Sequence, residues 1–403
     1  MDTVDTELDP GARLAGRPVR GAAGFSWAAA LVATAPAWVA ARVIALLLER
    51  LVQSTGQHPQ PQLPDGTLIN GPFGQLLSWD ASWYLGLAEH GYGAYGPTGL
   101  RFSPLLPLAT RAVSALGIPG PAAILLICWV AAFFFGVLVY RLALDLTGDL
   151  STASRAAWLS QLAPGAFALT MGYSEPLFEL CAAAFLIAIL RPVHGSPAAA
   201  TRLWLYAGFA AGCAAGLARP VGLLLALPGL IELVRRRQAP LGQLVARFLV
   251  ALAPLLGTFG YLAWCRIAYG QFMLPYTVQS TPGLHGGLAT DPLQTIWHML
   301  NASSMTGLEM LTVFLVVAAL ALLWVCARRL PVSLTLWAAL MVLSGLTAVQ
   351  LAGYARYASA AIPLVVAAAM VPKDRRAWAW MLGGTIFAFG YLCYGAFTGW
   401  YIP

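Results

Sequence analysis

Charged residues are scarce in this chain. Only 10% of its 403 residues are Asp, Glu, Lys or Arg, whereas soluble proteins average about 25%. Hydrophobic residues make up 59% of the sequence, and the mean hydropathy is +0.73. Lys373 is the only lysine, and this scarcity, together with abundant Ala, Gly and Pro, is typical of a GC-rich bacterial genome. The composition excludes an ordinary soluble domain and predicts an all-α, polytopic membrane protein.

The chain also lacks the short motifs of several kinds of site. It has no Gly-x-x-x-x-Gly-Lys phosphate loop, and no Gly-x-Gly-x-x-Gly follows a predicted strand, so nothing indicates a bound nucleotide. Its six cysteines form no Cys-x-x-Cys pair, and we interpret them as packing residues. None of its five histidines pairs at metal-ligand spacing. The sequence therefore predicts no metal and no cofactor, and its dispersed basic residues, despite a net charge of +7, predict no nucleic-acid partner.

Long apolar segments are plentiful, and they predict about eleven transmembrane helices. They lie at about 25–48, 121–143, 156–172, 176–190, 203–218, 221–234, 244–268, 308–327, 332–353, 357–371 and 377–399. A bilayer needs about 20 residues per spanning helix. Four segments fall short, namely 176–190, 203–218, 221–234 and 357–371, so we expect them to stop at a polar cavity or to pack inside the bundle. The two halves show no evident similarity, which weakens the case for an inverted-repeat transporter.

The distribution of basic residues predicts how these segments are oriented in the membrane. With residues 1–24 as a cytoplasmic tail, alternation places sixteen basic residues inside, six outside, and Arg42 within the first span. The six are Arg50, Arg101, Arg111, Arg219, Arg266 and Arg356. The excess inside supports this orientation. The membrane domain then covers 25–403 and begins with a retained anchor, which fits better than a cleaved signal peptide.

Two long loops lie outside in this arrangement, at about 49–120 and 269–307. Residues 105–117 are apolar enough for a short helix in the membrane interface. The first loop also contains the most informative stretch of the chain, residues 79–92, where acidic residues and aromatic side chains interrupt the apolar sequence.

If residues 79–90 form a helix, Trp79, Trp83 and Leu87 share one face, with Asp80 and Tyr84 on its flank. Such a helix would lie along the membrane surface, with its aromatic side chains at headgroup level. Its exposed carboxylate could then activate a hydroxyl beside a lipid-borne substrate. The alternative is structural: Ser78 caps the helix and Asp80 only complements the helix dipole.

A second acidic motif, Tyr173-Ser174-Glu175-Pro176, interrupts the apolar run 156–190 at its outer end. A carboxylate in lipid costs about 2.5 kcal/mol or more, so Glu175 must face protein or water. Ser174 and Pro176 suit a helix start, as N-cap and first-turn residue. A plain hairpin turn is the alternative, but Glu179, one helical turn below Glu175, favours a wet cavity.

Four of the outer arginines, Arg101, Arg219, Arg266 and Arg356, lie near predicted membrane boundaries. The planar guanidinium group suits phosphate oxygens. Each arginine taken singly could simply extend to the lipid headgroups. As a set facing Asp80 and Glu175, they indicate an anionic ligand on the outer side.

Five motifs occur in a fixed order, and together they resemble the PIG-V family of mannosyltransferases, in the GT-C class of membrane glycosyltransferases. They are Trp79-Asp80 with Trp83-Tyr84 and Gly91-Tyr92, Phe102-Ser103-Pro104-Leu105-Leu106-Pro107, Tyr173-Ser174-Glu175-Pro176-Leu177-Phe178, Ala218-Arg219-Pro220-Val221-Gly222-Leu223, and Arg356-Tyr357. The resemblance covers roughly residues 25–370. It departs from the family at Ser103, where an aromatic residue is more common before proline.

The resemblance implies a GT-C-like, multi-spanning enzyme that takes a sugar from a polyprenyl-phosphate donor on the outer face, with the catalytic acid in the first external loop, here Asp80. We therefore predict an inverting mannosyltransferase in a bacterial plasma membrane, acting on a lipid or glycan acceptor. Asp80 would be the base. The predicted substrate-binding residues are Glu175, Arg219, Arg356, Arg101, Arg266, Trp79, Trp83, Tyr84, Tyr173, Ser174 and Tyr357. The alternatives are a transporter or flippase of a lipid-linked sugar, and a scaffold without activity.

Overall fold

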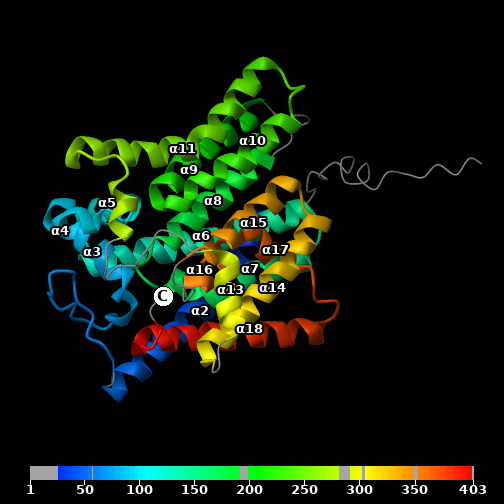
Figure 1. The fold of residues 1–403 in the computed structure, drawn as a ribbon. Coiled ribbons are helices and arrows are strands. Elements are labelled where there is room, and N and C mark those ends of the chain that lie inside the picture. The colour runs from blue at the N-terminus through cyan, green and yellow to red at the C-terminus, as the bar shows by residue number, and fades with distance from the viewer. Residues whose placement is uncertain are drawn as a thin grey trace, which may run out of the picture.

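The computed structural model describes residues 26–56, 58–190, 198–280, 291–301, 305–348 and 353–401. Within these ranges the chain is helical and forms no strand, apart from an isolated bridge between Gln62 and Leu68. Figure 1 shows long helices that run roughly side by side, with the short helices of the first long loop gathered at one end. The predicted all-α class is confirmed. The tail 1–24 lies outside the described residues.

Five helices of the described residues are long and apolar enough to cross a membrane. They are α2 (Trp27–Thr55), α6 (Gly120–Thr147), α11 (Leu241–Tyr269), α14 (Gly307–Arg329) and α18 (Arg375–Thr398). A sixth crossing is possible if η2 (Pro164–Thr170) and α8 (Glu175–Leu190), which meet at 109°, count as one broken span. The total of eleven spans stays a prediction.

Three of the four segments expected to fall short are short or interrupted helices, whereas 203–218 belongs to a continuous helix of 21 residues, so that expectation is wrong for it. Segment 357–371 divides into α16 (Tyr354–Ala360) and α17 (Ile362–Ala369), and nearly all of α17 is buried. Segment 221–234 divides into η3 (Pro220–Leu225) and α10 (Ala226–Arg235). The remaining bundle helices are α7 (Leu150–Leu162), α9 (Ala198–Ala218) and α15 (Val332–Leu346). These short elements let helix ends, with their polar backbone groups, meet inside the protein.

The first long loop, predicted to be external, folds into η1 (Gln75–Leu77), α3 (Asp80–His90), α4 (Tyr92–Gly99) and α5 (Leu105–Ser114). Helix α3 confirms the helix expected from the Trp-Asp motif, and α5 confirms the short helix at 105–117. The sequence predicted that this helix would lie along the membrane surface, and the structure differs. Most of α3 is buried, Tyr84 and Leu87 included, because α5 and α6 pack against it. The second loop contains α12 (Leu274–Thr277), η4 (Val278–Ser280) and α13 (Pro292–Leu300).

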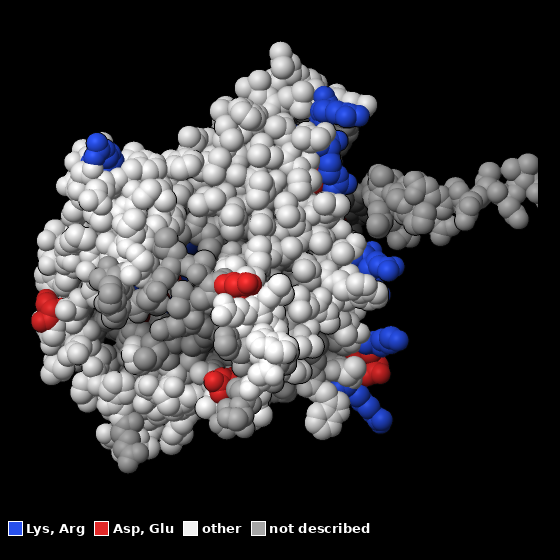
Figure 2. All heavy atoms as spheres, viewed as in Figure 1, with Lys and Arg blue, Asp and Glu red and all other residues white. Residues whose placement is uncertain are grey.

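Exposed charges are unevenly distributed. Figure 2 shows most of the visible Lys and Arg side chains along one side of the molecule, the side opposite α3 and α4, and one basic side chain at the upper left. Exposed basic residues lie after α10 and α17, at the end of α14 and at the start of α18, namely Arg237, Arg329, Lys373, Arg375 and Arg376. The loop helices α3 to α5 therefore lie at the end of the bundle away from this basic side.

Candidate active site

Asp80 is the first residue of α3, and the preceding residue has an unusual backbone. Trp79 has φ 59°, in a region that is costly for any residue with a side chain. The indole Nε1 of Trp79 donates a hydrogen bond of 2.9 Å to the carbonyl of Ala396 in α18, which holds the start of α3. Ser78 does not cap the helix, because its hydroxyl donates to Gln75 instead. The expectation of a Ser78 cap is therefore wrong.

Glu175 begins α8, directly after the bend that follows η2. Its side chain is only 3% exposed, so the interpretation of a carboxyl facing protein is confirmed. Ser174 accepts a hydrogen bond of 2.9 Å from the hydroxyl of Tyr84 in α3. Burial raises the pKa of Tyr84, with a further contribution from the charge of Asp80, so this hydroxyl stays protonated and can donate. The two acidic motifs are thus joined by a hydrogen bond between their neighbours.

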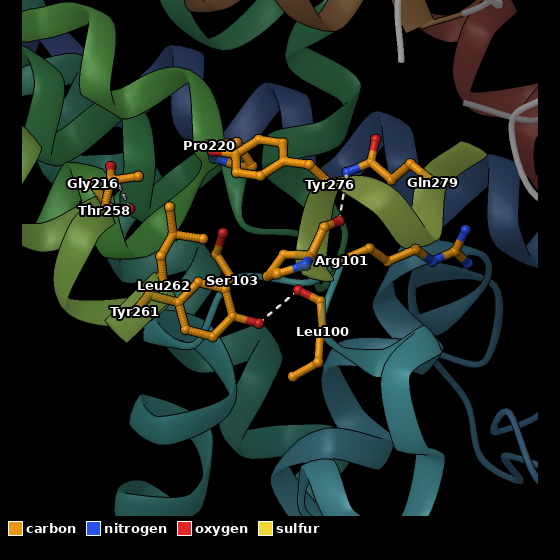
Figure 3. A pocket seen from close by; sticks show the side chains of 11 residues that line it. Leu100, Arg101, Ser103, Gly216, Pro220, Thr258, Tyr261, Leu262, Tyr276 and Gln279 are labelled. Carbon is orange, nitrogen blue, oxygen red and sulfur yellow. Dashed lines mark hydrogen bonds between the residues drawn. The ribbon is translucent and has the colours of Figure 1, made fainter. Parts of the chain in front are cut away.

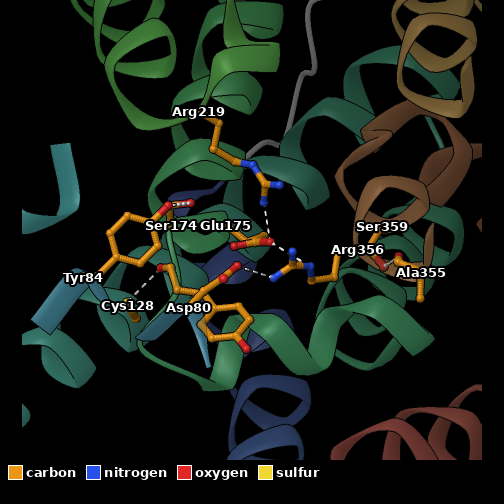
Figure 4. A network of polar contacts seen from close by, with 10 residues as sticks. Asp80, Tyr84, Cys128, Ser174, Glu175, Arg219, Ala355, Arg356 and Ser359 are labelled. Carbon is orange, nitrogen blue, oxygen red and sulfur yellow. Dashed lines mark hydrogen bonds and ion pairs between the residues drawn. The ribbon is translucent and has the colours of Figure 1, made fainter. Parts of the chain in front are cut away.

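Asp80 and Glu175 are linked by arginines from two other parts of the chain (Figure 4). Arg356 in α16 contacts both acids: its Nη1 lies 3.0 Å from Oδ2 of Asp80, and its Nε lies 3.4 Å from Oε1 of Glu175. Arg219, between α9 and η3, forms a second ion pair with the same Glu175 oxygen. The result is a chain of alternating charge, Asp80–Arg356–Glu175–Arg219, which we call the four-residue charge chain.

Exposure differs along the charge chain. The Asp80 side chain is 35% exposed, whereas the other three side chains are at most 14% exposed. Oδ1 of Asp80 has no protein partner within the described ranges. Asp80 is therefore the member of the chain that a substrate can reach.

Aromatic rings support the two arginines. The guanidinium of Arg356 lies 5.2 Å from the ring centre of Tyr173, and that of Arg219 lies 5.6 Å from the ring of Tyr357. Cation–π contacts of this kind strengthen when they are shielded from water. Tyr173 is completely buried and Tyr84 nearly so. The structure thus places these rings inside the protein, and Trp83, half-buried, has the more accessible ring for a sugar.

Arg101 lies in the turn between α4 and α5, with no ion pair among the described residues. Its guanidinium lies 5.0 Å from the ring centre of Trp83 and 4.7 Å from that of Phe102, and these two rings stack on each other. Burial lowers the pKa of Arg101, and the charge of Asp80 partly offsets this effect. The structure does not bring Arg266 to the same place: it is exposed at the end of α11 and bonds the carbonyl of Gly270.

A pocket of about 290 Å³, which includes its open mouth, adjoins Arg101 (Figure 3). The loop 100–103, α9, α11 and α12 form its walls. Its lining residues are Leu100, Arg101, Ser103, Gly216, Pro220, Thr258, Tyr261, Leu262, Pro275, Tyr276 and Gln279. Tyr261 closes one wall by donating a hydrogen bond of 2.6 Å to the carbonyl of Leu100. Arg101 and Pro220, the residue after Arg219, both line the pocket.

Sequence analysis did not identify several residues of the candidate site. Phe102 and Phe178 lie beneath Arg101 and Arg219, and both belong to motifs in which only polar neighbours had been singled out. Tyr276 and Gln279 of the pocket carried no signal beyond their place in a predicted external loop.

In the described part of the chain, no three His, Cys, Asp or Glu side chains are grouped so that they could hold a metal ion.

Comparisons with known proteins identify a matching family and structures with a similar fold. The family model of Mannosyltransferase (PIG-V) matches residues 39–277, which is more than half of the chain. No curated protein sequence matches the chain. The crystal structure of ArnT from Cupriavidus metallidurans bound to undecaprenyl phosphate superimposes with a TM-score of 0.54 at 16% identity, over 86% of this chain and 62% of that one.

The apo structure of ArnT from Cupriavidus metallidurans gives a TM-score of 0.53 at 16% identity, over 87% of this chain and 62% of that one. The chain therefore spans less than two thirds of the length of these ArnT structures. At this identity the likeness shows a shared fold, the GT-C membrane architecture.

Proposed function

Because the chain belongs to the mannosyltransferase (PIG-V) family, we propose that it moves mannose from a polyprenyl-phosphate donor to a lipid or glycan acceptor. The observation that carries this proposal is the charge chain, in which a single accessible carboxylate, Asp80, is held by buried ion pairs. A polyprenyl phosphate, the ligand named for the ArnT structure of the same fold, supports the class of donor. The fold and the apolar helices support a multi-pass membrane protein.

Asp80 acts as the general base in this proposal. Oδ2 is held by Arg356, so Oδ1 takes the proton of the acceptor hydroxyl. The acceptor oxygen forms a bond to the anomeric carbon while the bond from that carbon to the phosphate oxygen breaks. Attack from the face opposite the leaving phosphate inverts the anomeric configuration. The proton then passes from Asp80 to water.

Arg101 receives the donor phosphate. Arg219 and Arg356 are engaged by Glu175 and Asp80, and these four charges cancel. Arg101 is then the positive group near Asp80 without a carboxylate partner among the described contacts. A fixed guanidinium beside the departing phosphate stabilises the charge that develops on it. The adjoining pocket borders this phosphate position.

The site opens to the external face in this proposal, and the basic side of the molecule faces the cytoplasm. The side on which Lys and Arg gather lies away from α3 to α5, as the positive-inside rule requires (Figure 2). The plasma membrane of a bacterium is the proposed location.

Transfer from a defined donor tests the proposal. Purified protein in lipid nanodiscs receives radiolabelled polyprenyl-phosphate mannose, polyprenyl-phosphate glucose or GDP-mannose, each with a bacterial lipid and glycan extract. We expect labelled product from the first donor alone, with the anomeric configuration opposite to that of the donor. Transfer from GDP-mannose would contradict the donor assignment. Label that crosses sealed vesicles without a new glycosidic bond would favour the transporter alternative.

A further inference from the structure

The bend between η2 and α8 leaves backbone groups without helical partners. At 109° the two helices cannot share a hydrogen-bond ladder, so carbonyls near the break need other donors. Within a membrane protein each such group must be satisfied internally, because lipid offers no hydrogen bonds. Glu175 is the first residue after this bend, so the donors also decide where its carboxylate points.

Side chains of α2 and α6 supply the missing donors. Nη2 of Arg42 donates a hydrogen bond of 2.9 Å to the carbonyl of Leu169, and Nε1 of Trp129 donates one of 2.8 Å to the carbonyl of Thr170. Past the bend, Sγ of Cys128 donates to the carbonyl of Tyr173 at 3.2 Å. Both sides of the break are therefore tied to neighbouring helices.

Arg42 is unusual among these donors, because it is a cation inside a membrane-spanning helix. It is 4% exposed, and no carboxylate forms an ion pair with it in the described part of the chain. Its Nη1 bonds Oε1 of Gln161 at 2.8 Å, and its guanidinium lies 5.0 Å from the ring centre of Trp38. Burying an arginine without a carboxylate partner is costly. The hydrogen bonds of Arg42 to Gln161 and Leu169 offset part of this cost.

The bend is also tied to the loop that carries the base. The amide of Gly172 donates a hydrogen bond of 3.0 Å to the carbonyl of Leu76, four residues before Asp80. A shift of the bend would therefore move Glu175 and the start of α3 together. We propose that Arg42 and Trp129 are positioning residues, which hold the bend so that Glu175 can orient Arg356 and, through it, Asp80. This proposal rests on the proposed function for its kinetic consequence.

Two variants test the proposal, each with two measurements. Arg42→Lys keeps the charge but cannot bond Leu169 and Gln161 at the same time with the planar fork of a guanidinium group. Trp129→Phe removes the indole N–H donor and keeps an aromatic ring. We expect kcat for transfer to fall at least tenfold in Arg42→Lys and about threefold in Trp129→Phe, with the donor KM within twofold of wild type. A merely structural role would lower the folded fraction and leave kcat of the folded enzyme unchanged.

The second measurement does not depend on activity. Ser174 is 3% exposed, so a Ser174→Cys reporter reacts slowly with a thiol reagent, as measured on its own peptide by mass spectrometry. We expect Arg42→Lys and Trp129→Phe to accelerate this labelling at least tenfold. Arg50→Met is the matched control, because Arg50 lies on the same helix, is exposed and bonds only the Gln53 side chain; it should change neither measurement.

Unchanged labelling of the Ser174→Cys reporter in folded Arg42→Lys and Trp129→Phe would overturn the positioning proposal. Faster labelling with wild-type kcat would overturn it as well, because the bend would then move without affecting the site. If the wild-type protein transfers no sugar, the proposed function fails, and the labelling alone still decides whether Arg42 and Trp129 hold the bend.

Discussion

At the scale of single residues, the site consists of one accessible acid and a buried support. The two acids of the charge chain differ in exposure: Asp80 is about one third exposed, whereas Glu175 is enclosed by Arg219 and Arg356. Buried ion pairs rarely add net stability over apolar packing, but the loss of one partner leaves an uncompensated charge. The arginines can therefore be distinguished by whether their loss costs stability or donor binding.

Arg219→Ala should lower the free energy of unfolding by about 3–5 kcal/mol, because it leaves the buried Glu175 carboxylate with one partner fewer. Thermal unfolding in detergent measures this effect. The double variant Arg219→Ala, Glu175→Gln should recover much of the loss. A rise in donor KM with unchanged stability in the single variant would instead assign Arg219 to the donor phosphate.

Arg101→Ala should weaken donor binding by about 1.5–3 kcal/mol, the value of a lost hydrogen bond to a charged group. The donor KM and isothermal titration with polyprenyl phosphate measure it. Arg266→Ala is the control, since that side chain is exposed and bonds only a neighbouring backbone carbonyl. Equal effects of the two substitutions would place the phosphate elsewhere.

At the scale of elements, the charge chain depends on how closely η2 and α16 approach each other. A Cβ on Gly165 of η2 would overlap the backbone carbonyl of Ala355, the residue before Arg356. A backbone carbonyl cannot swing aside as the end of a flexible side chain can, so α16 would have to move. A glycine at this position lets the helix that carries Arg356 lie directly against the segment that leads to Glu175.

Gly165→Ala should destabilise the protein by at least about 1–3 kcal/mol, the usual cost of overpacking, and should lower transfer by displacing Arg356. Gly383→Ala is the matched control, because Gly383 lies in α18 with open space around its Cβ position. Ala is the better helix former, so this control should be neutral or slightly stabilising. Melting temperature and kcat are the measurements. Wild-type kcat in Gly165→Ala would show that the spacing of η2 and α16 does not matter.

The sequence predicted the elements of the site better than their contacts. Asp80, Glu175 and Arg356 stood out because charged residues are rare in apolar segments, and a helix at the Trp-Asp motif follows from local pattern. The pairing of Arg356 with Asp80 joins positions 276 residues apart, and no local pattern specifies it. The bend after η2 was also unpredictable, because it is held by Arg42 and Trp129 from other helices.

At the scale of the whole molecule, the orientation in the membrane decides which substrates can reach Asp80. A cysteine at position 94, exposed in α4, should react with a membrane-impermeant thiol reagent added to intact cells. A cysteine at position 237, exposed after α10, should react only after the cells are opened. The reverse pattern would place the site in the cytoplasm and remove the basis for an external lipid-linked donor.

The central claim is that Asp80 is the base of a glycosyl transfer. Asp80→Asn keeps the size of the side chain and a hydrogen-bonding oxygen toward Arg356, but it cannot take the acceptor proton. Single-turnover transfer from radiolabelled polyprenyl-phosphate mannose, measured in nanodiscs on wild type and Asp80→Asn at equal folded protein, tests this directly. We predict a rate about 10²–10⁴-fold lower in the variant, with donor binding retained. A rate within threefold of wild type would contradict the claim and leave Asp80 as a structural partner of Arg356.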